Sequence, residues 1–310
     1  MEDWTYGLAI ALCAVLWVMI FVDYRKKLML VMPSVKHVSS RRHDFSTKIS
    51  EADISAQEIS VNIDSVRREI SELEDRRQEF QDKLNEREMV FISVGSFKLG
   101  SDLVGRENEN PEHLVQAKAF YLDRFEVTNL QYKDFIDATG RRTPVHWQSG
   151  NFPTGRADHP VVNVTWEDAS AYADWVNKRL PTEAEREWAA RETEGRECSW
   201  GKQVNQDFAN FSNPEGGTSS VDKYIKGQSE FRIWDMCGNV GEWVNDWFEA
   251  TYYARSPDSD PQGPPDGRKK VYRADGYQTK SHRYRALYRH NAMPTMYQDY
   301  IGFRCALCSE

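Results

Sequence analysis

The chain contains few of the residues that build metal centres and disulfide frameworks. Its 310 residues include five cysteines and seven histidines. The cysteine spacing is not that of a disulfide framework. Cys305 and Cys308 are spaced like half of a zinc site, but no second pair accompanies them. We therefore expect these two cysteines to have a structural or incidental role.

An excess of positive charge is also missing. The 48 acidic residues outnumber the 40 basic ones, and the formal net charge is -8. A protein that binds the phosphate backbone needs a basic surface. The balance therefore excludes nucleic acid as the main partner.

Charged residues are absent from the run Tyr6 to Val22, which is nearly all apolar. About 18 such residues can span the hydrocarbon core of a bilayer. A cleaved signal peptide has a basic start, whereas this chain starts with Glu2 and Asp3. We predict an uncleaved transmembrane anchor at residues 1–27, with residues 5–22 in the bilayer. The alternative is a buried core helix, but no polar residue interrupts the run to make an amphipathic face.

Basic residues follow the apolar run of this anchor, and none precedes it. By the positive-inside rule, they place the remainder of the chain in the cytoplasm. The residues concerned are Arg25, Lys26, Lys27, Lys36, Arg41 and Arg42. Residues 28–44 are expected to be a juxtamembrane linker.

Proline and glycine are absent between Phe45 and Val94, and residues 45–87 carry a heptad pattern. Apolar positions that are separated alternately by three and four residues over several heptads predict a coiled coil. We expect it to form a homo-oligomer whose order stays open, and the alternative is one amphipathic helix packed on the following domain. The a positions are Ile49, Ala56, Ile63, Ile70, Arg77 and Leu84, and the d positions are Ala52, Ile59, Val66, Leu73 and Phe80.

Residues 88–310 carry local signals for a strand, turns and helices. An apolar strand-like run begins at Met89, and a turn-rich surface loop covers 258–267. Helices are predicted at 129–139 with Asn129 as N-cap, at 166–178 with Thr165 and Asp168 as a capping box, and at 182–191 with Thr182 as cap.

Four phrases in this domain are shared with one known family. Between residues 88 and 305, about 70% of the chain resembles the formylglycine-generating, or sulfatase-modifying factor, family. The resemblance implies an irregular α+β fold related to C-type lectins. Many relatives are extracytoplasmic, which keeps a periplasmic or extracytoplasmic location open. The phrases are Phe125-Glu126-Val127-Thr128-Asn129, Arg179-Leu180-Pro181-Thr182-Glu183-Ala184-Glu185, Gly238-Asn239-Val240 with Glu242-Trp243, and Ile301-Gly302-Phe303-Arg304-Cys305.

The resemblance also implies a structural calcium ion. Its ligands would be the side chains of Asp235 and Glu242 and the carbonyls of Gly238 and Val240. Calcium accepts such hard oxygen ligands, including carbonyls from a turn. The alternative is that the two carboxylates cap backbone amides in an irregular loop. Arg186 departs from the family, which usually has Trp there.

The family's catalytic cysteines are not present. In the enzyme, two cysteines bind copper(I), which needs soft thiolate ligands. Here Thr279 and Ser281 stand near those positions, and a hydroxyl cannot replace a thiolate. We therefore expect no copper and no formylglycine-generating activity.

The resemblance places Thr279 and Ser281 in the family's active-site groove. The chain around them is rich in Tyr and Arg, which dominate binding hot spots. Arg285, Arg289 and Arg304 match scaffold arginines that bridge loops internally. The residues that do not match the family are better candidates for a partner surface, namely Tyr277, His282, Met296 and Tyr297. His282 and His290 could also meet in this groove.

These features together favour a non-catalytic, membrane-anchored scaffold or assembly subunit. It would oligomerise through the coiled coil and bind a membrane-complex partner with a pseudoenzyme domain. One alternative is a metal- or oxygen-dependent oxidoreductase with a rebuilt active site in the same groove. The other is a lectin-like ligand receptor.

Overall fold

The computed structural model divides the chain after Glu79 into two units, Met1–Glu79 and Phe80–Glu310. It describes Val66, Arg68, Ile70 and Ser71, all helical, and residues 89–102, 107–191, 196–201, 205–280 and 285–309. The predicted anchor (1–27) and linker (28–44) lie outside these residues, as does the predicted coiled coil (45–87) apart from the four helical positions. Within the described ranges, no helix is long and apolar enough to cross a membrane. The anchor and the coiled coil stay predictions.

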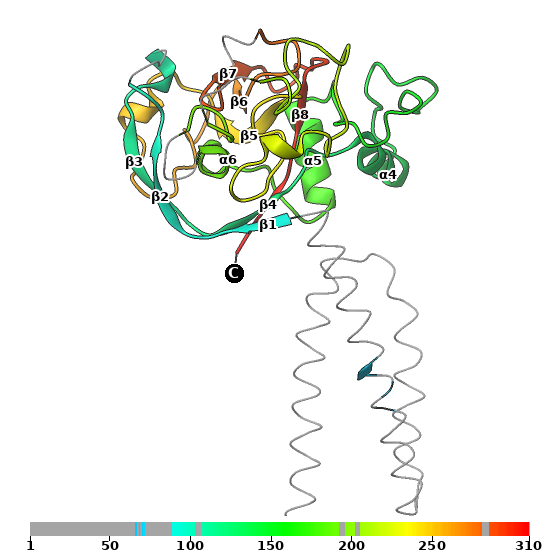
Figure 1. Ribbon diagram of the computed structural model, residues 1–310, viewed down its shortest axis with the longest axis horizontal. Helices are drawn as coiled ribbons and strands as arrows, with labels where there is room; N and C mark the ends of the chain where they lie inside the picture. The colour runs from blue at the N-terminus through cyan, green and yellow to red at the C-terminus, as the bar shows by residue number, and fades with distance from the viewer. Residues whose placement is uncertain are drawn as a thin grey trace, which may run out of the picture. The chain divides into compact units, whose positions relative to one another are not determined.

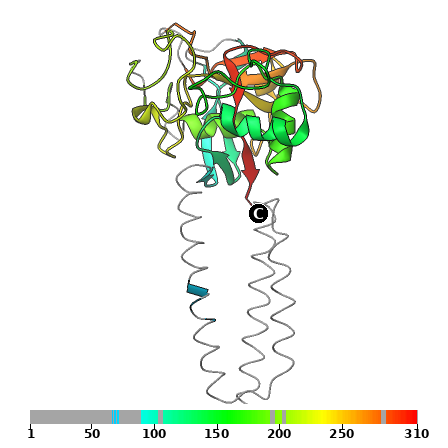
Figure 2. The same cartoon turned by 90° about the vertical axis from the view of Figure 1, so that its right-hand side faces the viewer.

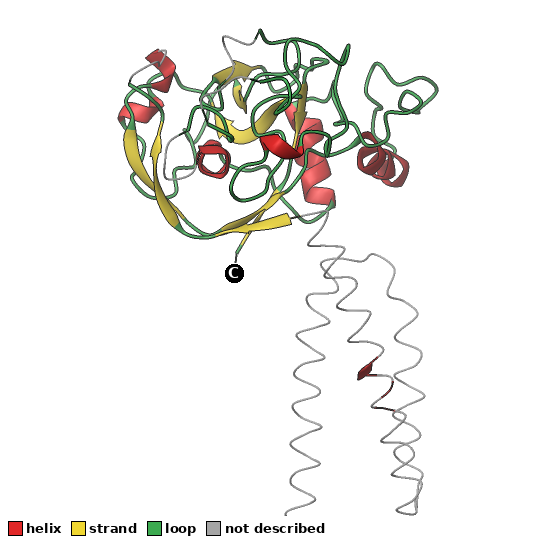
Figure 3. Cartoon of the chain, in the orientation of Figure 1, coloured by secondary structure: helices red, strands yellow, loops and turns green. Residues whose placement is uncertain are grey.

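Short strands form three sheets in the second unit, and loops connect them (Figures 1 and 3). One antiparallel sheet joins β1 (Met89–Ile92), β4 (Phe120–Asp123) and β9 (Ala306–Cys308). A second pairs β2 (Gly95–Leu99) with β3 (His113–Ala117). The third has the order β7 (Arg289–Ala292), β6 (Lys270–Arg273), β5 (Gly241–Trp247) and β8 (Ile301–Phe303). Only the β5–β8 pair is parallel. The predicted α+β class is confirmed.

Three α-helices form where the sequence predicts them. They are α4 (Asn129–Thr139), α5 (Trp166–Trp175) and α6 (Glu183–Arg191), and the 3₁₀ turns are η2 (Glu107–Glu109), η3 (Ile225–Gly227) and η4 (Tyr252–Ala254). The capping boxes of α5 and α6 are confirmed by bonds from the Asp168 and Glu185 amides to Thr165 and Thr182 Oγ1, 3.0 and 3.1 Å long. Figure 2 shows α4 and α5, which pack on each other, on one side of the domain.

Two predicted helix limits were wrong. The N-cap of α4 is Thr128, because its side chain accepts the amide of Gln131. Helix α5 ends at Trp175, three residues before the predicted end. Asn177 takes the left-handed conformation, with φ of 57°, and the Lys178 amide donates back to the Ala173 carbonyl. This closure satisfies the last carbonyls of the helix.

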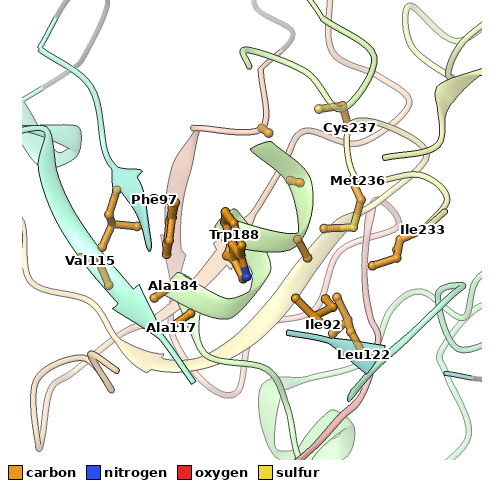
Figure 4. Packing of buried hydrophobic residues seen from close by; sticks show 14 of the residues in the cluster. Ile92, Phe97, Val115, Ala117, Leu122, Ala184, Trp188, Ile233, Met236 and Cys237 are labelled. Atoms are coloured by element: carbon orange, nitrogen blue, oxygen red, sulfur yellow. The ribbon is translucent and has the colours of Figure 1, made fainter. Parts of the chain in front are cut away.

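Two apolar clusters fill the domain. The first surrounds α6 and includes Trp188, Phe97 and Met236 (Figure 4). Trp188 lies between the β2–β3 ribbon and the loop that carries Met236 and Cys237. The second cluster joins α4 and α5 to β5 and β8 through stacked and edge-to-face aromatic rings, among them Tyr132, Phe135, Tyr172, Trp243 and Phe303.

Helix α6 is buried along its whole length although five of its nine residues are charged. It packs against β2, β3, β5 and β6. Arg273 of β6 donates to Glu183 at 2.6 Å and to Glu187 at 2.5 Å, and none of its side chain is exposed. Arg289 of β7 donates to the same Glu183 at 2.7 Å. The helix can therefore stay buried because the Glu183 and Glu187 carboxylates face arginines of the sheet.

We expect Arg273→Met to destabilise the domain by about 3–5 kcal/mol, because it breaks two buried ion pairs and leaves Glu183 and Glu187 with one arginine each, Arg289 and Arg191. Chemical denaturation would measure this loss. The matched control is Arg255→Met, because Arg255 pairs with Glu249 at the exposed surface. The control should leave the midpoint of unfolding unchanged. Equal effects of the two substitutions would contradict a structural role for the buried network.

Candidate functional site

The segment from Asp235 to Val240 is an irregular loop that leads into β5. Three of its residues have left-handed backbone angles, with φ of 54° at Asp235, 122° at Gly238 and 56° at Asn239. Only glycine adopts such angles without strain, although Asn and Asp tolerate them better than other residues. The surrounding structure must therefore fix this loop.

Asn239 supplies much of that fixation from a fully buried position. Its side-chain amide donates to Glu126 Oε2 at 2.9 Å, and its Oδ1 accepts the Ser219 amide at 2.8 Å. Its backbone donates to the Asn210 carbonyl and accepts from the Tyr277 amide. The side chain and backbone of Asn239 thus connect its loop to four other residues, which are Glu126, Asn210, Ser219 and Tyr277.

Glu242, one of the four predicted calcium ligands, is bound by two arginines. Arg186 Nε and Nη2 donate to its two carboxylate oxygens at 3.0 and 2.9 Å. Arg304 Nε and Nη2 donate to the same oxygens at 2.8 and 2.9 Å. These bidentate pairs neutralise the carboxylate and occupy both of its oxygens. Arg186, the residue that departs from the family pattern, is therefore the residue that fills one side of Glu242.

Asp235 has the opposite surroundings. Its side chain is 2% exposed, and neither carboxylate oxygen has a hydrogen-bond partner. Burial raises the pKa of Asp235 from 3.8 to about 8, and the nearby Glu242 adds to the increase against the effect of Arg304. Burial also raises the pKa of Glu126 well above its usual value, with Asp235 and Glu242 adding to that increase. A proton on this acid pair therefore relieves their repulsion.

The four predicted ligands do not fit calcium as a complete set. Asp235 offers unbonded oxygens, but those of Glu242 are held by Arg186 and Arg304. Within the described part of the chain, no group of three or more His, Cys, Asp or Glu side chains is placed to hold a metal ion. Calcium at Asp235, Gly238, Val240 and Glu242 stays a prediction, and we derive no chemistry from it.

The two positions predicted to stand in place of the family's catalytic cysteines, Thr279 and Ser281, are only partly covered by the described residues. Thr279 is half-buried in a turn, where its amide donates to the Gly276 carbonyl at 3.0 Å. Its own carbonyl accepts from the Ser212 amide at 2.9 Å. Ser281 and His282 lie outside the described residues. Cys305 is fully buried, and burial raises the pKa of its thiol well above the usual value. Cys308 is exposed on β9 and accepts from Arg179 Nε at 3.3 Å.

The predicted partner residues separate by exposure. Tyr277 is buried, and its hydroxyl donates to Asp299 Oδ2 at 3.2 Å. Met296 and Tyr297 are 41% and 37% exposed, and the neighbouring Met293 is 46% exposed. The Arg142 guanidinium stacks 5.3 Å from the Tyr297 ring centroid. We call Met293, Met296, Tyr297 and Arg142 the Met–Tyr patch.

The Met–Tyr patch lies on a backbone that is fixed from both sides. The Trp166 amide donates to the Pro294 carbonyl at 3.0 Å, and the Asn163 amide donates to the Gln298 carbonyl at 2.9 Å. The Met296 amide closes the turn onto the Met293 carbonyl. The patch is thus presented without further ordering of its loop. Two of its four residues, Met293 and Arg142, were not predicted from the sequence. The three-residue separation of Met293 from Met296 was a signal that they could lie on one turn.

The internal role expected for the three groove arginines is confirmed. Arg285 donates to Glu109 at 2.8 Å, Arg289 to Glu183 and Arg304 to Glu242. His290 lies beside them on β7 and contacts Asp275 Oδ1 through Nε2 at 2.9 Å. Its ring also stacks on Tyr272, with centroids 4.9 Å apart. Whether His290 meets His282 is untested, since His282 is outside the described residues.

We expect the free energy of unfolding to decrease between about pH 4 and 8 through Asp235. The folded chain keeps a proton on this group that the unfolded chain releases above about pH 4. The stabilisation is complete below the unfolded pKa and is lost as the pH approaches 8. Asp235→Asn mimics the protonated acid, so thermal unfolding should show a smaller decrease for the variant.

Calcium titration at about pH 7.5 completes this test, since a metal binds the ionised carboxylate. If calcium raises the melting temperature of the wild type, and Asp235→Asn abolishes that increase, calcium binds the ionised Asp235 and a proton alone does not account for this site. Asp222→Asn is the matched control, because Asp222 is an exposed carboxyl near the same loop.

Comparison with known proteins identifies the family to which this domain is similar. Residues 75–308 match the family model described as "Sulfatase-modifying factor enzyme 1-like domain". The formylglycine-generating enzyme of Streptomyces coelicolor is 33% identical over 282 residues, which cover 71% of this chain and 89% of that protein. The inactive C-alpha-formylglycine-generating enzyme 2 of Bos taurus is 29% identical over 272 residues, covering 70% and 87%.

A solved structure gives the same result. PvdO from Pseudomonas aeruginosa superposes with a TM-score of 0.60 at 28% identity, covering 71% of this chain and 94% of that one. The resemblance read from the sequence phrases is therefore confirmed by the match of both sequence and fold. The chain belongs to the sulfatase-modifying factor family, the family of the formylglycine-generating enzymes.

Proposed function

We propose that this chain is a non-catalytic member of its family that binds a protein partner through the Met–Tyr patch. The observation that carries the proposal is an exposed, pre-ordered group of methionine, tyrosine and arginine side chains in a family whose enzymes need cysteines that this chain lacks. A relative from Bos taurus is itself named an inactive formylglycine-generating enzyme, which supports a non-catalytic role.

The chemistry of the remaining thiols supports the non-catalytic part. A copper(I) site needs thiolate ligands that can approach one another and the substrate. Cys198, Cys237 and Cys305 are buried in the domain, and Cys308 points outward from β9. Burial raises the pKa of the Cys305 thiol, so it stays protonated. Thr279 offers only a hydroxyl.

The composition of the Met–Tyr patch supports the binding part. Tyr and Arg are enriched in binding hot spots, and methionine adapts its shape to a partner surface. Arg142 Cζ is 5.3 Å from the Tyr297 ring, so both side chains are already positioned before binding. Two exposed methionines, Met293 and Met296, lie on the same turn. Such a surface suits a protein better than a small polar ligand.

The remaining parts of the proposal come from the sequence. Residues 1–27 would anchor the chain in a membrane, and residues 45–87 would join copies of it. The basic cluster after the anchor favours a cytoplasmic domain, with an extracytoplasmic one as the alternative. A membrane-protein complex is accordingly the expected partner, and a structural calcium on the Asp235 loop is included as untested.

A second candidate function rests on His290 and Asp275. A histidine held by a carboxylate at 2.9 Å can accept a proton, and Asp275 Oδ2 is buried without a partner. Asp275 precedes Thr279 by four residues, and Thr279 is one of the two residues predicted to stand near the positions of the family's catalytic cysteines. An oxidoreductase with a rebuilt active site would use it, whereas the receptor alternative has no observation of this kind in its favour.

Site-specific photocrosslinking in the native membrane tests the partner surface. A photoreactive phenylalanine analogue at Met296 should give one discrete protein adduct, and Tyr297→Ala should reduce it by roughly tenfold, the loss of about 1.4 kcal/mol expected for a hot-spot residue. The control position is Ile225, which is 66% exposed on η3. Equal adducts from both positions, or none from Met296, would contradict the proposed surface.

Activity measurements test the non-catalytic part separately. Purified full-length protein, supplied with copper(I), oxygen and a cysteine-containing sulfatase peptide, should leave the peptide mass unchanged. The formylglycine-generating enzyme of Streptomyces coelicolor is the positive control. Turnover that is lost in His290→Asn, with unchanged thermal stability, would instead establish the oxidoreductase alternative.

A further inference from the structure

Two cysteines that are distant in the sequence meet in the first apolar cluster. Cys198 lies in the segment 196–201, and Cys237 lies in the loop that leads into β5. The Cys198 side chain is 2% exposed, and that of Cys237 is 1% exposed. A side-chain hydrogen bond joins the two thiols. Figure 4 shows Cys237 beside Met236 on the loop above α6.

The other two described cysteines have different neighbours. The Cys305 amide donates to Asp123 Oδ2 at 2.8 Å, and the Cys308 sulfur accepts from Arg179. Within the described ranges, no cluster of metal ligands surrounds Cys198 and Cys237. Thiols joined by a hydrogen bond need only a side-chain movement to reach the disulfide length of about 2.05 Å. The Cys198–Cys237 pair is therefore the one arranged for joining.

We propose that Cys198 and Cys237 form a disulfide when the chain folds in an oxidising compartment and stay as dithiol in a reducing one. The oxidant is a small-molecule or protein disulfide. A Cys198 or Cys237 thiolate attacks it and forms a mixed disulfide, and the second thiol displaces the remaining half. One sulfur–sulfur bond forms in the protein, one breaks in the oxidant, and the two protons and two electrons leave on its two thiols.

The reaction belongs to folding rather than to the finished protein. Both sulfurs are nearly inaccessible, and the hydrogen bond to Cys237 together with burial raises the pKa of the Cys198 thiol. A buried protonated thiol is a poor nucleophile. Once the domain has closed, the oxidation state of the pair therefore records the compartment in which the chain folded.

The bond would also stabilise the loop that carries Asp235 and Asn239. It would close about 40 residues of chain and reduce the freedom of the unfolded state. The loop needs such support, since Asp235 and Asn239 on either side of Cys237 have left-handed backbones. This consequence does not depend on the proposed partner surface.

The test expresses the full-length chain in two bacterial strains, one with an ordinary reducing cytoplasm and one with an oxidising cytoplasm. Cells are lysed in denaturant with N-ethylmaleimide, and peptides are mapped without reduction. We expect a Cys198–Cys237 cross-linked peptide in the oxidising strain and two alkylated thiols in the reducing strain if the domain folds in the cytoplasm. A cross-link in both strains also supports the pair and places the domain outside the cytoplasm.

Two variants and a stability measurement complete the test. Cys308→Ser is the matched control and should keep the cross-link, whereas Cys237→Ser should abolish it. Reducing the oxidised wild type should lower its melting temperature by about 5 °C or more. The proposal is overturned if both thiols are alkylated in the oxidising strain, or if Cys198 and Cys237 are linked mainly to Cys13, Cys305 or Cys308.

Discussion

The domain depends on a set of buried arginine–carboxylate pairs centred on α6. Arg273 lies between Glu183 and Glu187, Arg289 shares Glu183, and Arg191 shares Glu187. Opposite charges alternate, so no member is left uncompensated, and each guanidinium also fixes the direction of its partner. Such pairs add little to net stability but penalise any packing that separates them. A domain with few and short strands gains from them a single arrangement of its loops.

The same principle explains the loop before β5. Glu242 is balanced by Arg186 and Arg304, and Asn239 connects the surrounding backbone. Asp235 and Glu126 are the two further buried acids beside this loop, and neither is bound by an arginine in the way that Glu242 is. A proton, a cation or both must balance these two acids, and pH and calcium titrations distinguish proton from cation because these have opposite requirements for the ionisation of Asp235.

On the proposed function, the family fold holds a binding surface in place rather than the family's catalytic cysteines. The buried pairs, the capped helices and the aromatic cluster give the chain the means to hold a surface in place. Such a surface can change at the residues around Thr279 and at the Met–Tyr patch without unfolding the domain. Function therefore has to be argued from exposed side chains rather than from the fold.

The sequence alone determined the class of the domain, its family and the three helices. Capping at Thr165 and Thr182 is local chemistry, since the hydroxyl and the carboxylate lie three residues apart. The phrases at 179–185 and 301–305 indicated the family, and they contain Glu183 and Arg304, which form buried pairs in the structure. The heptads at 45–87 and the apolar run at 6–22 are equally local signals, and they remain predictions because the described residues do not cover them.

Only the tertiary structure decided which charges and thiols meet. Arg186 and Glu242 are 56 residues apart, and nothing in their spacing indicates that one guanidinium covers the predicted calcium ligand. The spacing of Cys198 and Cys237 gave no sign of a disulfide framework, yet a side-chain hydrogen bond joins them in the fold. Tyr277 and Tyr297 have similar sequence surroundings, but one ring is buried and the other exposed. Contacts of this kind depend on how distant loops pack, and no local periodicity encodes that packing.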